Sequence, residues 1–327
     1  MLSTVIDYEV LLNFTRNQPE QIPKGTEEEN EYWNSFWAFM KMGSNLIITN
    51  LPTLNYSVPE NYFLRSLTTG RKGSSFKSEI SFNKPHKCKF PKDQNVQTVF
   101  FLNEQSESEK AKYRKNNGFL FGFMNDYPKI WKKLSLHGKD KNLPVSKSEN
   151  INFKSWAQLS DYILPFSDLI IIDNYMLDEK KWKNNLLKII DEFSNKSSVK
   201  FNLLLVSFLH STDINSYQDK VSKIKDLLKV VNCNLSIILS KELIKVHDRD
   251  IFTNYLWINS GSSLNYFNND GNLDIDTKIF FNSLVKKDNM NTSKAALSSI
   301  KTIIERLQKL PDKDKRLFGD LKNKLLN

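Results

Sequence analysis

The sequence predicts an α/β protein in which a mixed, largely parallel sheet is flanked by helices. Short, continuously apolar segments alternate with amphipathic segments in the second half of the chain, and this alternation is typical of a buried parallel sheet with crossover helices. The apolar segments are residues 168–173, 201–208 and 235–239, and the helical ones are residues 179–193 and 216–231. Residues 244–259 follow as a predicted two-stranded hairpin, which adds antiparallel strands to the same sheet.

The first half of the chain contains a second α/β region. Its predicted strands are residues 5–14, 45–51, 98–103 and 118–124. A helix is predicted over residues 30–42, where Trp33, Phe36, Trp37 and Met40 recur at helical spacing as a core stripe. Residues 52–92 have no regular pattern, and residues 135–150 are predicted to be a polar loop or linker.

The C-terminal segment is predicted to be helical and basic. Residues 294–310 place Leu297, Ile300, Ile303 or Ile304, Leu307 and Leu310 on one face, and Pro311 ends the helix. We therefore expect an N-terminal α/β domain of unknown role at residues 1–150, a second α/β domain at 151–287 and a basic helical segment at 288–327.

The charge of the chain favours an anionic partner. The formal net charge is +10, and residues 286–327 alone hold eleven Lys and Arg against five acids, a net +6. Lys294, Lys301, Arg306 and Lys309 are the candidate nucleic-acid contacts. An anionic membrane surface is the other partner that this charge favours, and a solvated helical face in a Lys- and Asn-rich chain is the plain alternative.

One short segment contains several groups suited to phosphate chemistry. It reads His247-x-Arg249, four residues, Asn254, six residues, Gly261-Ser262-x-x-Asn265. On a strand, His247 and Arg249 project from the same face. A guanidinium and an amide beside an imidazole can hold phosphate oxygens while a ring nitrogen faces phosphorus.

This segment resembles the HKD motif of the phospholipase D superfamily, His-x-Lys-x4-Asp-x6-Gly-Ser-x-x-Asn. His247, Gly261, Ser262 and Asn265 match the motif, and every gap length matches. The resemblance implies a phospholipase D-like fold over about residues 160–285, with His247 as the nucleophile that forms a phosphohistidine. It also implies that Arg249 and Asn265 grip the phosphate, that Ser262 supports the turn, and that no metal or other cofactor takes part.

Two positions depart from the family pattern. Arg249 stands in place of lysine, which keeps the charge and changes the geometry. Asn254 stands in place of the aspartate, and a lost orienting carboxylate lowers catalytic rates strongly. A His-x-Arg variant followed by Asn is also similar to the phospholipase D-like C-terminal domain of MIT-domain proteins, which is linked to membrane binding.

The family's chemistry uses two such motifs, and no other histidine of this chain supplies a second one. His86, His137 and His210 each lack part of the pattern. An active enzyme is therefore expected to be a homodimer with the His247 side chains of both subunits near the twofold axis.

Other short patterns carry less information. Gly70-Arg71-Lys72-Gly73-Ser74-Ser75 lacks the spacing of a phosphate-binding loop, so it is predicted to be a basic surface loop. The acidic residues 25–31 are predicted to be a solvated loop because adjacent glutamates cannot all face one metal ion. Cys88 and Cys233 have no metal-type spacing.

Three functions follow from these patterns. The first is a metal-independent phosphodiesterase, a nuclease, acting on DNA or RNA through His247. The second is a catalytically degenerate module that binds nucleic acid or anionic lipid. The third is a bacterial defence effector whose N-terminal half docks a protein partner. The chain has no long apolar run and no basic segment before its first apolar residues, so a cytoplasmic location is expected.

Overall fold

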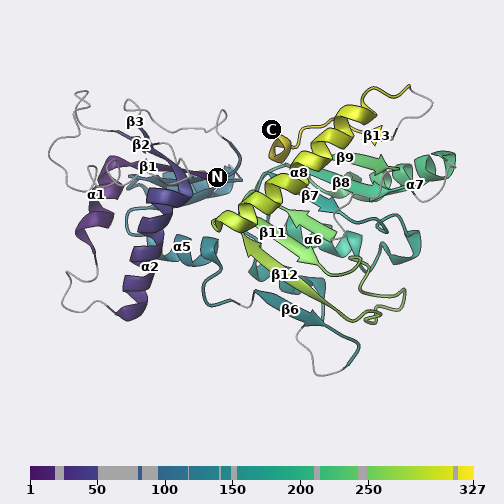
Figure 1. The fold of residues 1–327 in the computed structure, drawn as a ribbon, viewed down its shortest axis with the longest axis horizontal. Coiled ribbons are helices and arrows are strands. Elements are labelled where there is room, and N and C mark those ends of the chain that lie inside the picture. The colour runs from purple at the N-terminus through teal and green to yellow at the C-terminus, as the bar shows by residue number, and fades with distance from the viewer. Residues whose placement is uncertain are drawn as a thin grey trace. The chain divides into compact units, whose positions relative to one another are not determined.

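The chain forms two compact units, each built around its own sheet (Figure 1). The computed structural model describes residues 1–18, 26–50, 80–82, 95–116, 118–139, 141–148, 153–209, 214–241, 249–311 and 316–327. Unit 1 comprises Met1–His137 with Val285–Lys287, and unit 2 comprises Gly138–Leu284 with Asp288–Asn327.

The sheet of unit 1 is entirely parallel. Its strand order is β3-β2-β1-β4-β5. The bounds are β1 Leu2–Asp7, β2 Ser44–Thr49, β3 Ile80–Phe82, β4 Thr98–Leu102 and β5 Leu120–Phe123. The chain first builds outward from β1 to β3 and then returns to place β4 on the other side of β1. This reversal is the topological switch point of a doubly wound sheet, where the carboxyl ends of β1 and β4 lie side by side.

The helices of unit 1 are fixed by aromatic packing and by their ends. They are α1 Tyr8–Arg16, α2 Glu27–Ala38, α4 Glu107–Asn116 and α5 Tyr127–Ser135, with a π-helical turn at Phe39–Gly43. Thr26 and Glu29 form a reciprocal capping box at the start of α2. The predicted aromatic stripe is confirmed, because the Trp33 ring stacks on Phe14 at a centroid distance of 4.8 Å and Phe36 meets Phe14 edge-on at 5.3 Å.

The prediction of one strand over residues 5–14 is wrong at its second half. β1 ends at Asp7, and α1 follows without a loop. Val10, Leu11 and Phe14 are buried together, and the spacing of 10, 11 and 14 is helical rather than alternating. The apolar residues of β1 and α1 follow one another in the sequence without a polar break. The change from the alternating period of a strand to the period of a helix was therefore not recognised.

The sheet of unit 2 is mixed, with order β13-β9-β8-β7-β10-β11-β12-β6. β7, β8 and β9 are parallel, and every other pair is antiparallel. The bounds are β6 Asn142–Val145, β7 Asp168–Ile172, β8 Phe201–Phe208, β9 Cys233–Ser240, β10 Arg249–Phe252, β11 Leu256–Ser260, β12 Thr277–Ser283 and β13 Leu317–Phe318. The predicted α/β class and the predicted β10–β11 hairpin are confirmed.

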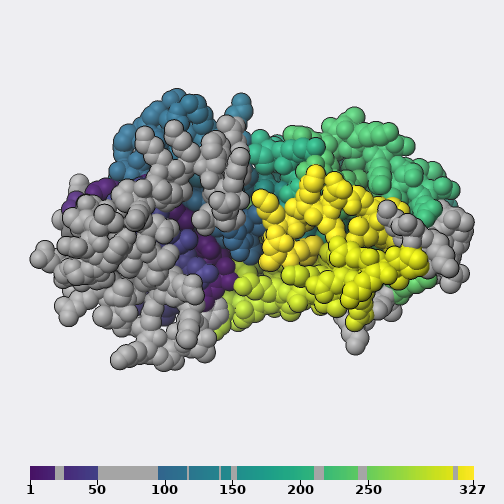
Figure 2. Space-filling model, turned by 90° about the horizontal axis from the view of Figure 1, so that it is seen from above, coloured from purple at the N-terminus to yellow at the C-terminus, as the bar shows by residue number. Residues whose placement is uncertain are grey.

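Helices lie on both faces of this sheet. They are α6 Leu186–Lys196, α7 Ile214–Leu227 and α8 Lys287–Leu307, with short 3-10 helices at Trp156–Asp161, Glu179–Lys181, Leu228–Val230 and Lys324–Leu326. α8 crosses the front of the sheet in Figure 1, and α6 lies behind it. The predicted apolar face of α8 is confirmed in its buried residues Leu297, Ile300, Ile304 and Leu307. Figure 2 shows the C-terminal residues, in yellow, at the surface of the molecule.

Two segments differ from the sequence-based division of the chain. The predicted linker at 135–150 contains β6, which pairs with β12, so the second unit starts before residue 150. The basic segment after residue 287 is part of unit 2 rather than a tail. Leu317 pairs with Ile238 of β9, and the Asn323 side-chain amide donates to the carbonyls of Leu169 and Asn202 at 3.1 and 3.0 Å.

Two negative findings concern the described residues. No helix among them is long and apolar enough to cross a membrane. The same part of the chain contains no group of three or more His, Cys, Asp or Glu side chains arranged to hold a metal ion.

Candidate functional site

The candidate site lies at the carboxyl end of β7, where β10 begins beside it. Asp250 pairs with Ile172, the last residue of β7, so Arg249 and Asp173 adjoin at the end of this ladder. The loop after β11, which holds Ser263 and Asn265, contacts the residues that follow β7 at the same end of the sheet. Carboxyl ends of parallel strands are the usual position of binding groups in α/β sheets.

Asp173 connects the segments that meet at this end of the sheet, which is called the corner below. Its side chain is only 1% exposed. Its Oδ1 accepts a hydrogen bond from the Tyr175 amide at 2.8 Å, and its Oδ2 accepts from the Ser263 hydroxyl at 2.8 Å and the Leu264 amide at 2.6 Å. Burial raises the pKa of the Asp173 carboxyl, and these three hydrogen bonds together with the Arg249 charge oppose that rise.

Arg249 and Asn265 both contact Tyr175. The Arg249 guanidinium carbon lies 5.6 Å from the centroid of the Tyr175 ring. The Asn265 side-chain amide donates to the Tyr175 carbonyl at 2.9 Å. Half of the Tyr175 side chain remains exposed. The structure therefore brings together the cation and the amide that were predicted to grip a phosphate.

The turn between β11 and Asn265 is held from inside the protein. The Ser260 hydroxyl lies 2.6 Å from both the Ser262 carbonyl and the Tyr266 hydroxyl. A Cβ at Gly261 would lie 3.1 Å from the Thr277 hydroxyl, so glycine relieves a close approach at this turn. The Ser262 hydroxyl is buried without a hydrogen-bond partner among the described residues, and Ser263 rather than Ser262 reaches Asp173.

Asn254 lies at the other end of β10. Its side-chain oxygen accepts from the Ser167 and Asp168 amides at 3.2 and 3.3 Å, and its amide donates to the Ser167 hydroxyl at 3.3 Å. Four residues of strand separate Arg249 from this turn by roughly 13 Å. Asn254 is fully buried and fastens the hairpin to the amino end of β7. The buried carboxylate beside Arg249 is Asp173.

His247 lies outside the described residues, as do His86, His210, Cys88 and the loop at 70–75. The prediction of a solvated loop over residues 25–31 is wrong from Thr26 onward, because Thr26 caps α2 and residues 27–31 form its first turns. Among the predicted nucleic-acid contacts, Lys294, Lys301, Arg306 and Lys309 are all exposed, the first three on α8.

Sequence reasoning missed Asp173, Tyr175 and Ser263. In the sequence, Asp173 was identified only as the last residue of a predicted apolar strand. Its position directly after a buried strand is a signal for a residue at the functional edge of a sheet, and that signal was available.

Unit 1 has a comparable carboxylate. Asp7 ends β1, is 7% exposed, and accepts hydrogen bonds from the Thr49 hydroxyl, the Asn50 side-chain amide at 2.7 Å and the Asn103 amide at 2.7 Å. These donors follow or end β2 and β4, so Asp7 ties three strand ends together at the switch point. Its hydrogen bonds therefore join the ends of β1, β2 and β4 to one another.

No family model matches this chain, and no curated protein sequence matches it significantly.

Proposed function

We propose that unit 2 is a phospholipase D-like phosphodiesterase that binds a single strand of nucleic acid at the corner formed by Arg249, Tyr175 and Asn265. The observation that carries the proposal is the contact of both Arg249 and Asn265 with Tyr175. A guanidinium recognises two phosphate oxygens at once, and a half-exposed aromatic ring beside it can stack on a base. The ring favours nucleic acid over a lipid headgroup as the ligand.

In the proposed reaction, an imidazole nitrogen of His247 attacks phosphorus. A P–N bond forms, and the bond from phosphorus to the leaving ester oxygen breaks. A proton from the corresponding histidine of a second subunit neutralises the leaving alkoxide as an alcohol, so the active form is a homodimer. Water then cleaves the phosphohistidine and restores both histidines.

Asp173 supports this proposal in a second way. The departure from the family pattern at Asn254 argues against activity only if that position orients the catalytic histidine. Asn254 binds the backbone at the far end of β10, and Asp173 supplies a carboxylate near Arg249 instead. The neutral side chain at 254 is therefore compatible with catalysis.

The test separates binding from cleavage. Purified full-length protein is incubated in EDTA with a fluorescently labelled single-stranded oligonucleotide. Binding is measured by anisotropy and cleavage by gel electrophoresis. His247→Ala is expected to abolish cleavage and retain binding. Arg249→Met is expected to weaken binding by about tenfold, the loss of one charge-assisted phosphate contact of ~1.4 kcal/mol.

Tyr175 provides a matched pair of variants. Tyr175→Phe keeps the ring and is expected to bind normally, whereas Tyr175→Ser should bind less tightly. Binding without any cleavage, lost in Arg249→Met, would overturn the enzymatic reading and identify a binding module. Unchanged binding in Arg249→Met would show that the corner is not the nucleic-acid binding site.

A further inference from the structure

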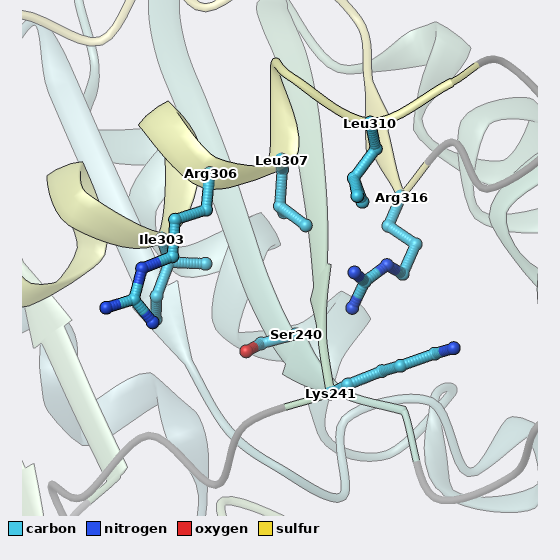
Figure 3. A pocket seen from close by; sticks show the side chains of 7 residues that line it. All are labelled: Ser240, Lys241, Ile303, Arg306, Leu307, Leu310 and Arg316. Carbon is cyan, nitrogen blue, oxygen red and sulfur yellow. The ribbon is translucent and has the colours of Figure 1, made fainter.

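Three cationic side chains line a pocket of unit 2 at the C-terminal end of α8. A pocket of about 100 Å³ opens there between the end of β9, the last turns of α8 and the residue before β13 (Figure 3). It is lined by Ser240, Lys241, Ile303, Arg306, Leu307, Leu310 and Arg316. None of these residues belongs to the Arg249 corner.

The backbone on two sides of the pocket is fixed by the sheet. The Leu239 amide donates to the Arg316 carbonyl at 2.9 Å, and Leu317 pairs with Ile238. Arg316 is thereby held next to Ser240, which is 2% exposed. On the third side, the buried Leu307 anchors the end of α8. The backbone positions of the lining are therefore fixed by the fold, while the Lys241 and Arg306 side chains are exposed.

The polar side chains of the lining include three cations and no acid. Within the described part of the chain, no carboxylate lies within 4.0 Å of the Lys241 or Arg316 charged nitrogens. The Arg316 Nε is buried and has no hydrogen-bond partner among the described residues. A buried donor without an acceptor is costly, so this position calls for an acceptor that the described residues do not supply.

Figure 3 shows how the charged groups lie. Arg316 directs its guanidinium group toward Ser240, Arg306 lies on the other side of Ser240, and the leucine side chains cover the top in this view. The carbonyl end of α8 carries about half a negative charge, which the nearby cations outweigh. Stabilisation of that helix end alone would not require a buried, unpartnered Nε of Arg316, which comes from another element.

We propose that this pocket binds a phosphate monoester group. Its volume is well below the roughly 300–1,000 Å³ of sites that enclose a whole small-molecule ligand, so it admits one terminal group. A dianion matches the cluster of cations, the guanidinium of Arg316 offers paired donors to two oxygens, and the wall of Ile303, Leu307 and Leu310 accommodates the carbon atoms that follow. An internal diester, which continues on both sides of phosphorus, fits such a pocket less well.

The inference is independent of the proposed cleavage reaction, because it concerns other residues and a different phosphate ester. The terminal phosphate can belong to a mononucleotide or to the end of a nucleic-acid strand. Isothermal titration calorimetry of the full-length protein distinguishes these sources. The probes are inorganic phosphate, adenosine 5′-monophosphate, and one oligonucleotide with and without a 5′-phosphate.

The 5′-phosphorylated oligonucleotide is expected to bind more tightly than the 5′-hydroxyl oligonucleotide, and inorganic phosphate and adenosine 5′-monophosphate are expected to bind on their own. Lys241→Met and Arg316→Met should each reduce the gain in affinity from the 5′-phosphate by about tenfold. Arg316→Lys should reduce it by less, because a lysine keeps the charge but lacks the paired N–H donors of a guanidinium. Lys188→Met removes the same charge from the exposed side of α6, away from the pocket, so it serves as the control and should change little.

Two outcomes would overturn the proposal. One is equal affinity for phosphorylated and hydroxyl probes. The other is an equal loss in Lys188→Met and the pocket variants, which would indicate general attraction to a basic surface. Arg249→Met should weaken the binding of both oligonucleotides to the same extent and leave the gain from the 5′-phosphate unchanged, so failure of the corner and failure of the pocket give different results. A thermal midpoint matching wild type confirms that each variant is folded.

Discussion

Replacement of Asp173 tests the central feature of the candidate site. The carboxylate receives two backbone amides and one hydroxyl, all from residues that shape the corner. Alanine would leave the Tyr175 and Leu264 amides buried without an acceptor. Each amide left without an acceptor lowers the free energy of unfolding by ~1–3 kcal/mol. Removal of the buried carboxylate charge offsets part of this loss, because burial of a charge is itself unfavourable. We expect Asp173→Ala to lower the free energy of unfolding by about 3 kcal/mol.

Asparagine at the same position should cost less. Its single oxygen can face Ser263 and Leu264, and its amide group then faces the Tyr175 amide, so only one of the two backbone donors loses its acceptor. The expected loss is about 1–2 kcal/mol. Asp270→Asn is the matched control, because its side chain is exposed, and should change stability by less than about 0.5 kcal/mol.

The effect of pH has a defined sign. Burial raises the pKa of Asp173 above the unfolded value of about 3.9, so the folded protein holds this proton more tightly. The stabilising contribution is complete below the unfolded pKa and is lost as pH rises through the folded pKa. The difference in stability between wild type and Asp173→Asn should therefore shrink over that window.

Urea unfolding followed by tryptophan fluorescence, from about pH 4.5 to about pH 7.5, measures both effects. The reasoning is refuted if Asp173→Ala is no more destabilising than Asp270→Asn. It is also refuted if the difference between wild type and Asp173→Asn widens as pH rises.

Three further predictions follow from single contacts. Asn254→Ala removes three hydrogen bonds at the amino end of β7 and should destabilise by ~2–4 kcal/mol in urea unfolding, while the folded protein keeps its affinity for oligonucleotide; a specific loss of affinity would place Asn254 at the phosphate after all. Gly319→Ala places a Cβ 2.2 Å from the Leu235 carbonyl at a φ of +83°, so a lowered thermal midpoint, equivalent to ~2 kcal/mol or more, is expected; an unchanged midpoint contradicts this. Tyr266→Phe removes the hydroxyl that meets Ser260 in a fully buried position and should cost ~1–2 kcal/mol by the same measurement, against no loss if that hydrogen bond is unimportant.

Much of unit 2 was predictable because its elements bury continuous apolar runs. β8 has the predicted bounds of residues 201–208, and the apolar face of α8 follows its period. Short edge elements were missed for the converse reason. β6 contains a proline and only two buried residues, and its strand character comes from pairing with β12, which lies more than a hundred residues away.

The candidate site was predictable in part. Spacing alone selected Arg249 and Asn265, and the structure brings both to Tyr175. Spacing could not show that Asn254 lies away from these two residues. A motif gives only the separation along the chain, and the extended strand β10 places Arg249 and Asn254 at opposite ends. Asp173 and Tyr175 lie more than seventy residues from Arg249 in sequence, so only the register of β7 against β10 joins them.

The sequence by itself determined the α/β class, the alternation of strands and helices in unit 2, and the residue types available for phosphate chemistry, since these depend on local period and composition. Only the tertiary structure decided which of those residues meet. The pairing of β10 with β7 places Arg249 beside a buried carboxylate, and the pairing of β13 with β9 brings Arg316 to the pocket at the end of α8. Contacts of this kind depend on strand register between distant segments, which is set by the packing of the whole sheet.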